Sequence, residues 1–215
     1  MKKMLLVMIT VTLMPSVYSQ TGVNVNSDAR KKEGYFNSTQ IGFLMGNRSR
    51  SEPFSYYYGN RNRLQVAPSA TMTNGYIFNE KVAIGIGVGY EIFDHNHFPV
   101  FLDIRRTVWD NKVSPFFGLK IGHAIGNLKK KYYENLYFDY GTYNDVYFRN
   151  YGGFMLNPEM GVKIPLSENA DILFTVAYRY QKSKIKVSQK NYSHIDWERK
   201  ESMNRMSFGI AVMFR

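Results

Sequence analysis

Strict alternation of apolar residues with small or polar ones is the feature that most limits what this chain can fold into. In the segment VAIGIGVGYEIF, Val82–Phe93, every second residue from Val82 to Ile92 is apolar, and Gly85, Gly87, Gly89 and Glu91 lie between them. Successive side chains of a β-strand point to opposite faces of the sheet. The segment therefore predicts a strand with one apolar face and one face of small or charged residues.

The same period recurs in eight segments along the chain. They are Tyr35–Gly46, Ala67–Phe78, Val82–Phe93, Pro99–Val108, Val113–Gly126, Gly153–Leu166, Asp171–Gln181 and Met206–Phe214. Short turn-like connectors at 79–81, 109–112 and 167–170 alternate with connectors that are mostly longer, at 47–66, 128–151 and about 182–199, with 94–97 as a short exception. Short turns at one end and long loops at the other are typical of membrane barrels. The pattern predicts an all-β fold, an eight-stranded antiparallel up-and-down transmembrane β-barrel with both termini at the short-turn end.

A soluble barrel with an apolar interior is the main alternative to this fold. The distribution of glycines and charges argues against it, because small and charged residues share one face. Glycines share that face with Glu91 and with Lys120, and Ala177 shares it with Arg179. Small residues gather where space is short, so this face is expected to line the lumen and the aliphatic face to lie outside. So large an apolar exterior is unfavourable in water, and the pattern therefore favours a barrel that spans a membrane.

The N-terminus carries the pattern of a secretory signal peptide. Lys2 and Lys3 precede an apolar run from Met4 to Met14. The segment Val17-Tyr18-Ser19 then places small residues at the usual positions for cleavage before Gln20. We therefore expect a signal peptide at 1–19, a flexible segment at 20–33 and the barrel domain at 34–215. The sequence contains no cysteine, which excludes disulfides, thiolate metal sites and cysteine nucleophiles.

Two stretches resemble the bacterial outer-membrane β-barrel family of small porin-like, OmpA/OmpX-like proteins. They are GVGYEIFDHNHFPVFLDIRRTVWDNKVSPFFGLKIGHAIG and NPEMGVKIPLSENADILFTVAYRYQ. The resemblance implies a location in the bacterial outer membrane after secretion to the periplasm. It also implies recognition by the outer-membrane assembly machinery through a C-terminal strand that ends at Phe214. The family has many roles, so the resemblance specifies the architecture and not the activity.

The alternation places a set of polar side chains in the lumen: Glu91, Asp103, Arg105, Lys120, Glu159, Lys163, Arg179 and Arg205. Eight strands enclose a space just wide enough for side chains, so these charges are expected to pair. Asp103 and Arg105, two positions apart on one strand, are the pair we expect in this network. A structural plug is the first interpretation and a narrow path for small solutes is the second.

Lysines continue the outward face beyond the apolar band on two strands. Lys182, Lys184 and Lys186 follow Tyr178 and Tyr180, and Lys129 and Lys131 follow Ile125. This is the depth of lipopolysaccharide phosphates, which a row of cations would attract. We therefore expect these five lysines to contact lipopolysaccharide and outer-membrane lipid, with a merely solvated basic rim as the alternative.

The long connectors are rich in tyrosine. Residues 128–151 hold nine aromatics, and 47–66 add Phe54, Tyr56, Tyr57 and Tyr58 among arginines. Tyrosine provides rigid contact area on recognition surfaces, so an extracellular ligand is one interpretation. The other is that these residues extend a hairpin above the membrane. No nucleic-acid-binding motif accompanies the basic charge, and no nucleic-acid partner is expected.

Candidate catalytic and metal motifs are weak. The glycines at 85, 87 and 89 lie within an expected strand and open no helix, so they do not form a dinucleotide loop. The segment 94–97, with two histidines, reads as a polar hairpin tip rather than a metal site. Ser193 and His194 are adjacent and would point to opposite faces of a strand. We expect no enzyme, cofactor or metal, and a role in envelope structure or in surface and lipopolysaccharide interaction. A narrow channel is the alternative, followed by a lipid A-modifying enzyme.

Overall fold

The computed structural model describes residues 33–50, 65–79, 81–92, 96–109, 113–126, 131–137, 143–189 and 196–215. Nine strands lie in these ranges: β1 (Gly34–Arg50), β2 (Gln65–Phe78), β3 (Val82–Glu91), β4 (His97–Thr107), β5 (Ser114–Gly126), β6 (Lys131–Tyr137), β7 (Tyr143–Ser167), β8 (Ala170–Gln189) and β9 (Asp196–Phe214). Each of the eight alternating segments overlaps a strand of its own, and β6 is the addition.

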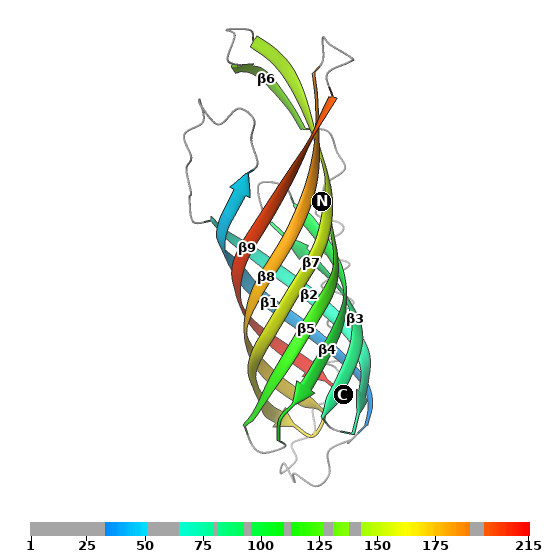
Figure 1. The fold of residues 1–215 in the computed structure, drawn as a ribbon. Helices are drawn as coiled ribbons and strands as arrows, with labels where there is room; N and C mark the ends of the chain where they lie inside the picture. Colours follow the sequence, from blue (N-terminus) through cyan, green and yellow to red (C-terminus); the bar gives the residue numbers. More distant parts are fainter. Residues whose placement is uncertain are drawn as a thin grey trace.

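The strands form one closed antiparallel sheet. They follow the order β5-β4-β3-β2-β1-β9-β8-β7-β6, and a further pairing of β5 with β7 closes the ring. Strand β6 pairs with β7 only between Tyr143 and Phe148, beyond the point where β5 leaves it. Eight strands therefore make the barrel wall, and β6 forms a hairpin on its rim (Figure 1). The predicted eight-stranded antiparallel barrel is confirmed.

The two faces of the wall differ as the alternation predicted. Along β3, Gly85, Gly87 and Gly89 are buried while the residues between them are exposed. Ile86 is 67% exposed and Ile41 is 65% exposed, and most strands carry further exposed aliphatic or aromatic residues. The apolar face is the outer one, which excludes the soluble barrel with an inward apolar face. No helix in the described ranges is long and apolar enough to cross a membrane.

Both chain ends of the barrel lie at the end with the short turns. Asn37, near the start of β1, pairs with Phe214 at the end of β9. The last residue, Arg215, donates its backbone N–H to the carbonyl of Asn169 in the turn between β7 and β8. Its guanidinium contacts the carboxylate of Asp171 at 2.6 Å, and both side chains are almost fully buried. The C-terminal residue is thus fixed to the wall rather than projecting from it.

Several strands are longer than predicted, so the expected boundaries of the three long connectors were wrong. Strand β7 has 25 residues, β8 has 20 and β9 has 19, against 10 for β3. Parts of the expected connectors at 47–66, 128–151 and 182–199 are therefore strand, and β7, β8 and β9 rise above the rest of the wall in Figure 1. The outward residues turn polar above the apolar band, so the apolar period ends while the strand continues. The backbone of 131–137 and 143–148 forms the hairpin that was one of the two interpretations.

Residues 1–32 and 51–64 lie outside the described residues, and with them the expected signal peptide, most of the flexible segment and the tyrosines at 56–58.

Candidate functional site

Residues from β4, β5 and β7 build the first charged cluster inside the barrel. Arg105 Nη2 contacts Asp103 Oδ2 at 2.6 Å, so the structure brings together the pair expected from the sequence. Glu159 Oε2 lies 2.7 Å from Lys120 Nζ, and Glu159 Oε1 lies 3.4 Å from Arg105 Nε. The cluster holds two carboxylates and two cations, and it is formally neutral. Neutral pairing of this kind is what makes buried charge tolerable in a narrow lumen.

Neutral polar side chains from β1, β2 and β8 complete this first cluster. Thr73 Oγ1 donates to Asp103 at 3.3 Å, and Arg105 Nη1 donates to Ser38 Oγ at 3.3 Å. Lys120 Nζ donates to Gln40 Oε1 at 2.8 Å, and the amide of Gln40 donates to Thr175 Oγ1 at 2.8 Å. The bonds join strands on both sides of the barrel, so the cluster spans the lumen and does not merely coat one wall.

A second cluster centres on Glu91 at the end of β3. Its Oε1 lies 2.5 Å from Arg179 Nη1, and its Oε2 lies 3.8 Å from Arg205 Nη2. Arg205 also donates to Gln181, and Arg179 contacts the sulfur of Met155. All eight lumen residues expected from the sequence, Lys163 included, are buried.

An apolar layer fills the lumen on the short-turn side of the charged clusters. It consists of Phe36, Ile77, Phe116, Leu173, Ala211 and Met213. Phe116, Leu173 and Met213, together with Arg105, line a cavity of about 20 Å³. A space of that size holds about one water molecule.

His97 corrects one sequence-based prediction. We expected it at a polar hairpin tip, but it is the first residue of β4 and its side chain is 1% exposed. Its Nε2 lies 3.2 Å from the amide nitrogen of Asn150, and Gly126 of the intervening strand β5 leaves room for this contact. The inward position follows from strand parity, because Pro99, Phe101 and Asp103 are also buried. Among the described residues, no group of three or more His, Asp or Glu side chains could hold a metal ion.

Sequence reasoning missed the neutral members of the network: Ser38, Gln40, Thr73, Asn150 and Gln181. Each occupies a position of inward parity, and that signal could have found them. Ser193 and His194, considered for a hydrolase, lie outside the described residues.

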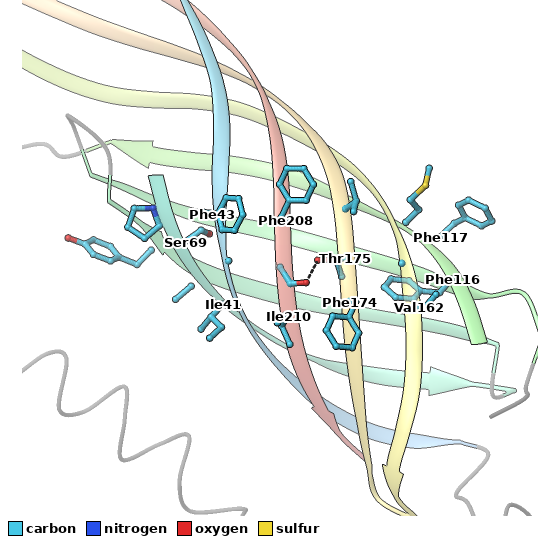
Figure 2. A pocket seen from close by; sticks show the side chains of 18 of the residues that line it. Ile41, Phe43, Ser69, Phe116, Phe117, Val162, Phe174, Thr175, Phe208 and Ile210 are labelled. Carbon is cyan, nitrogen blue, oxygen red and sulfur yellow. Dashed lines mark hydrogen bonds between the residues drawn. The ribbon is translucent and has the colours of Figure 1, made fainter. Parts of the chain in front are cut away.

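The outer wall of the barrel carries an apolar groove of about 1240 Å³. Its floor follows one row of cross-strand partners, Gly42, Gly209, Thr175 and Gly161. Figure 2 shows Phe43 and Phe208 on one side of this row, and Ile41, Ile210 and Phe174 on the other. Inward-facing residues show only backbone to the outside, and the flanking outward side chains form the banks of the groove. The surface suits contact with hydrocarbon chains.

The predicted lipopolysaccharide lysines are partly described. Lys182 and Lys184 are exposed, Lys186 is half-buried, and all three alternate with the buried Gln181, Ser183 and Ile185. They lie on the outward face of β8, above Tyr178 and Tyr180. The ammonium of Lys182 lies 5.9 Å from the ring centroid of Tyr180. Lys129 lies outside the described residues; Lys131 begins β6, and its side chain is not described.

A closed antiparallel barrel with an apolar exterior and a packed polar interior defines the class of small membrane β-barrels. The solved structures agree. Neisserial surface protein A (NspA) superposes with a TM-score of 0.52 and 11% identity, covering 86% of this chain and 99% of that chain. The outer-membrane protein OprG from Pseudomonas aeruginosa superposes with a TM-score of 0.51 and 13% identity, covering 89% of this chain and all of that chain. This likeness concerns the fold.

No protein-family model matches the sequence, and no curated protein matches it.

Proposed function

We propose that this chain is an integral protein of the bacterial outer membrane whose barrel is a closed anchor rather than a pore. In this role it supports envelope structure and presents an extended, basic wall to the outer leaflet and its lipopolysaccharide. The expected signal peptide accounts for export to the periplasm, and the C-terminal strand ending at Phe214 for recognition by the assembly machinery. No catalytic step is part of the proposal.

The packed lumen is the observation that carries this proposal. The charged side chains of Asp103, Glu159 and Glu91 are 0% exposed, and those of Arg105 and Lys120 are 7% and 5% exposed. A continuous water path would leave such side chains in contact with solvent. The neighbouring apolar layer of Phe36, Ile77, Phe116, Leu173, Ala211 and Met213 would have to part as well. A sealed interior favours the anchor over the narrow solute channel.

Single-channel recording in planar bilayers tests the proposal. The refolded protein is expected to give no reproducible conductance steps, because ions would have to cross both the charged cluster and the apolar layer. The double variant Arg105→Ala/Phe116→Ala removes two large side chains that line the same small cavity. This variant is the positive control, because it shows whether the recording detects an ion path through the lumen when one has been opened. Stable steps from the unmodified protein, at a frequency proportional to protein added, would overturn the sealed-anchor proposal in favour of the channel.

A further inference from the structure

Like charges face each other across the strands just above the apolar band. On the outward face, Arg149 of β7 is the cross-strand partner of Lys186 in β8. In the next pair of strands, Lys184 of β8 is the partner of Lys200 in β9. Like charges placed directly opposite in an antiparallel pair destabilise the sheet. Two such pairs on three neighbouring strands concentrate positive charge at this height of the wall, and an anion bound there would lower the repulsion within each pair.

The acidic residues present on this face do not balance the charge. Among the described outward side chains of this region, five are cationic, Arg149, Lys182, Lys184, Lys186 and Lys200, and Glu198 is the acidic one. Glu198 Oε1 lies 2.7 Å from Lys184 Nζ, with both side chains about half exposed. The described face therefore keeps a formal excess of four positive charges.

A hollow in the outer wall lies among these cations. It has a volume of about 590 Å³, and its lining includes Lys182, Lys184 and Lys200 together with Phe154, Tyr180, Ser202 and the buried Glu201. The wall is bare of side chains at Gly152 and Gly153, which also line it. Gly152 has a φ of +74° and follows an irregularity in the pairing of β7 with β8. A Cβ there would lie 1.8 Å from the carbonyl oxygen of Ala124, so glycine is required at this bend.

The position of the hollow identifies the class of its ligand. Tyr178 and Tyr180 mark the edge of the apolar band on β8, and Lys182 comes two residues later. Two residues of a strand tilted by about 45° rise roughly 5 Å, which places the lysines at the level of lipid headgroups. Phe154 and Tyr180 contribute apolar surface to the hollow, and Lys182, Lys184 and Lys200 contribute cations. An amphiphile with an anionic head matches this combination.

We propose that the hollow formed by β7, β8 and β9 binds the phosphorylated headgroup of an outer-leaflet glycolipid, with Lys184 and Lys200 clamping a phosphate between them. The site rests on the proposed outer-membrane function and gives its lipid contact a definite place. It differs from a row of lysines on β8 alone, because Lys200 comes from the neighbouring strand β9. A phosphate monoester carries close to two negative charges at neutral pH, enough to offset one facing lysine pair.

Native mass spectrometry of the purified, folded protein with added diphosphoryl lipid A tests this site. Lys184→Gln/Lys200→Gln removes the facing pair and is expected to weaken binding about fivefold or more. Lys184→Arg/Lys200→Arg keeps the charge and is expected to retain binding. Lys81→Gln/Arg106→Gln is the matched control, because it removes two exposed cations at the short-turn end of the barrel. Lipid A without phosphates is expected to bind weakly to all four proteins.

Several outcomes would overturn the site. They are unchanged binding by Lys184→Gln/Lys200→Gln, an equal loss in the Lys81→Gln/Arg106→Gln control, or equal binding of the lipid without phosphates. Efficient competition by inorganic phosphate at the lipid concentration would show that the hollow takes free phosphate rather than a lipid. Every variant is first checked for the heat-dependent gel shift of a folded barrel. A folded, non-conducting protein that binds no lipid here would refute the lipid site and leave the anchor proposal standing.

Discussion

Replacing Glu159 with glutamine removes the carboxylate that holds the first charged cluster together. The structure places it 2.7 Å from Lys120 and 3.4 Å from Arg105, and its side chain is 0% exposed. At an effective dielectric constant of about 20, these contacts contribute roughly 6 and 5 kcal/mol of attraction. Desolvation of the carboxylate offsets several kcal/mol of that sum. Because Glu159→Gln leaves two buried cations facing Asp103 alone, we expect the free energy of unfolding to fall by about 3–5 kcal/mol.

The assay for Glu159→Gln is urea-induced unfolding in lipid vesicles, followed by the gel shift that separates folded from unfolded barrel. Lys120→Met/Glu159→Met provides the internal test. It removes one charge of each sign and leaves the Asp103–Arg105 pair neutral, so it is expected to cost less than Glu159→Gln. Glu168→Gln, in the turn between β7 and β8, is the surface control and is expected to stay within about 0.5 kcal/mol of the unmodified protein. A loss below about 1 kcal/mol for Glu159→Gln, or a double variant worse than the single one, would refute the charge-balance argument.

Two further changes test the two faces of the wall. Ile86 is 67% exposed on the outer face, so Ile86→Arg is expected to lower the free energy of unfolding in vesicles by about 2–4 kcal/mol, and Ile86→Leu is expected to leave it unchanged. An unchanged free energy of unfolding for Ile86→Arg would contradict a lipid-facing wall. Gly87→Ala places a Cβ 2.3 Å from the ring of Phe101, so the midpoint of the heat-induced gel shift is expected to fall, by an overpacking cost of about 1–3 kcal/mol. Adding Phe101→Leu is expected to restore part of that loss, and no recovery would point to another cause.

The sequence was sufficient to locate the eight strands of the wall and to assign their residues to the two faces. A period of two assigns each residue to a face without knowledge of its neighbours, so Glu91, Asp103 and Arg179 could be placed inside directly. The pairing partners could not be assigned, because they depend on register. Glu159 meets Lys120 and Arg105 only because β5 lies between β4 and β7 in the closed sheet. The same limit hid Lys200, whose position opposite Lys184 is a property of the β8–β9 register.

The ends of the strands were misjudged for a related reason. Above the apolar band the outward face changes from Tyr180 to Lys182 and Lys184, while the inward face continues with buried Gln181, Ser183 and Ile185. A criterion that looks for apolar alternation stops at the edge of the membrane, although the backbone pairing goes on to Gln189. His97 was misplaced in the same way, because a polar residue at a strand end was taken for a turn.

Access to water decides whether a charged side chain of this barrel needs a partner of opposite charge, and the lumen and the outer wall differ in that access. Inside the lumen water is excluded, and Glu159 has two cations from the protein itself within 3.4 Å. On the outer wall above the band, Glu198 is about half exposed, and the cations around it outnumber it. Charges that water or a headgroup can reach do not need a partner from the chain, so their excess is tolerated there. Substitutions in the lumen should therefore lower the free energy of unfolding, whereas Lys184→Gln/Lys200→Gln should weaken lipid affinity without lowering that free energy, because the change also removes the repulsion between the two lysines.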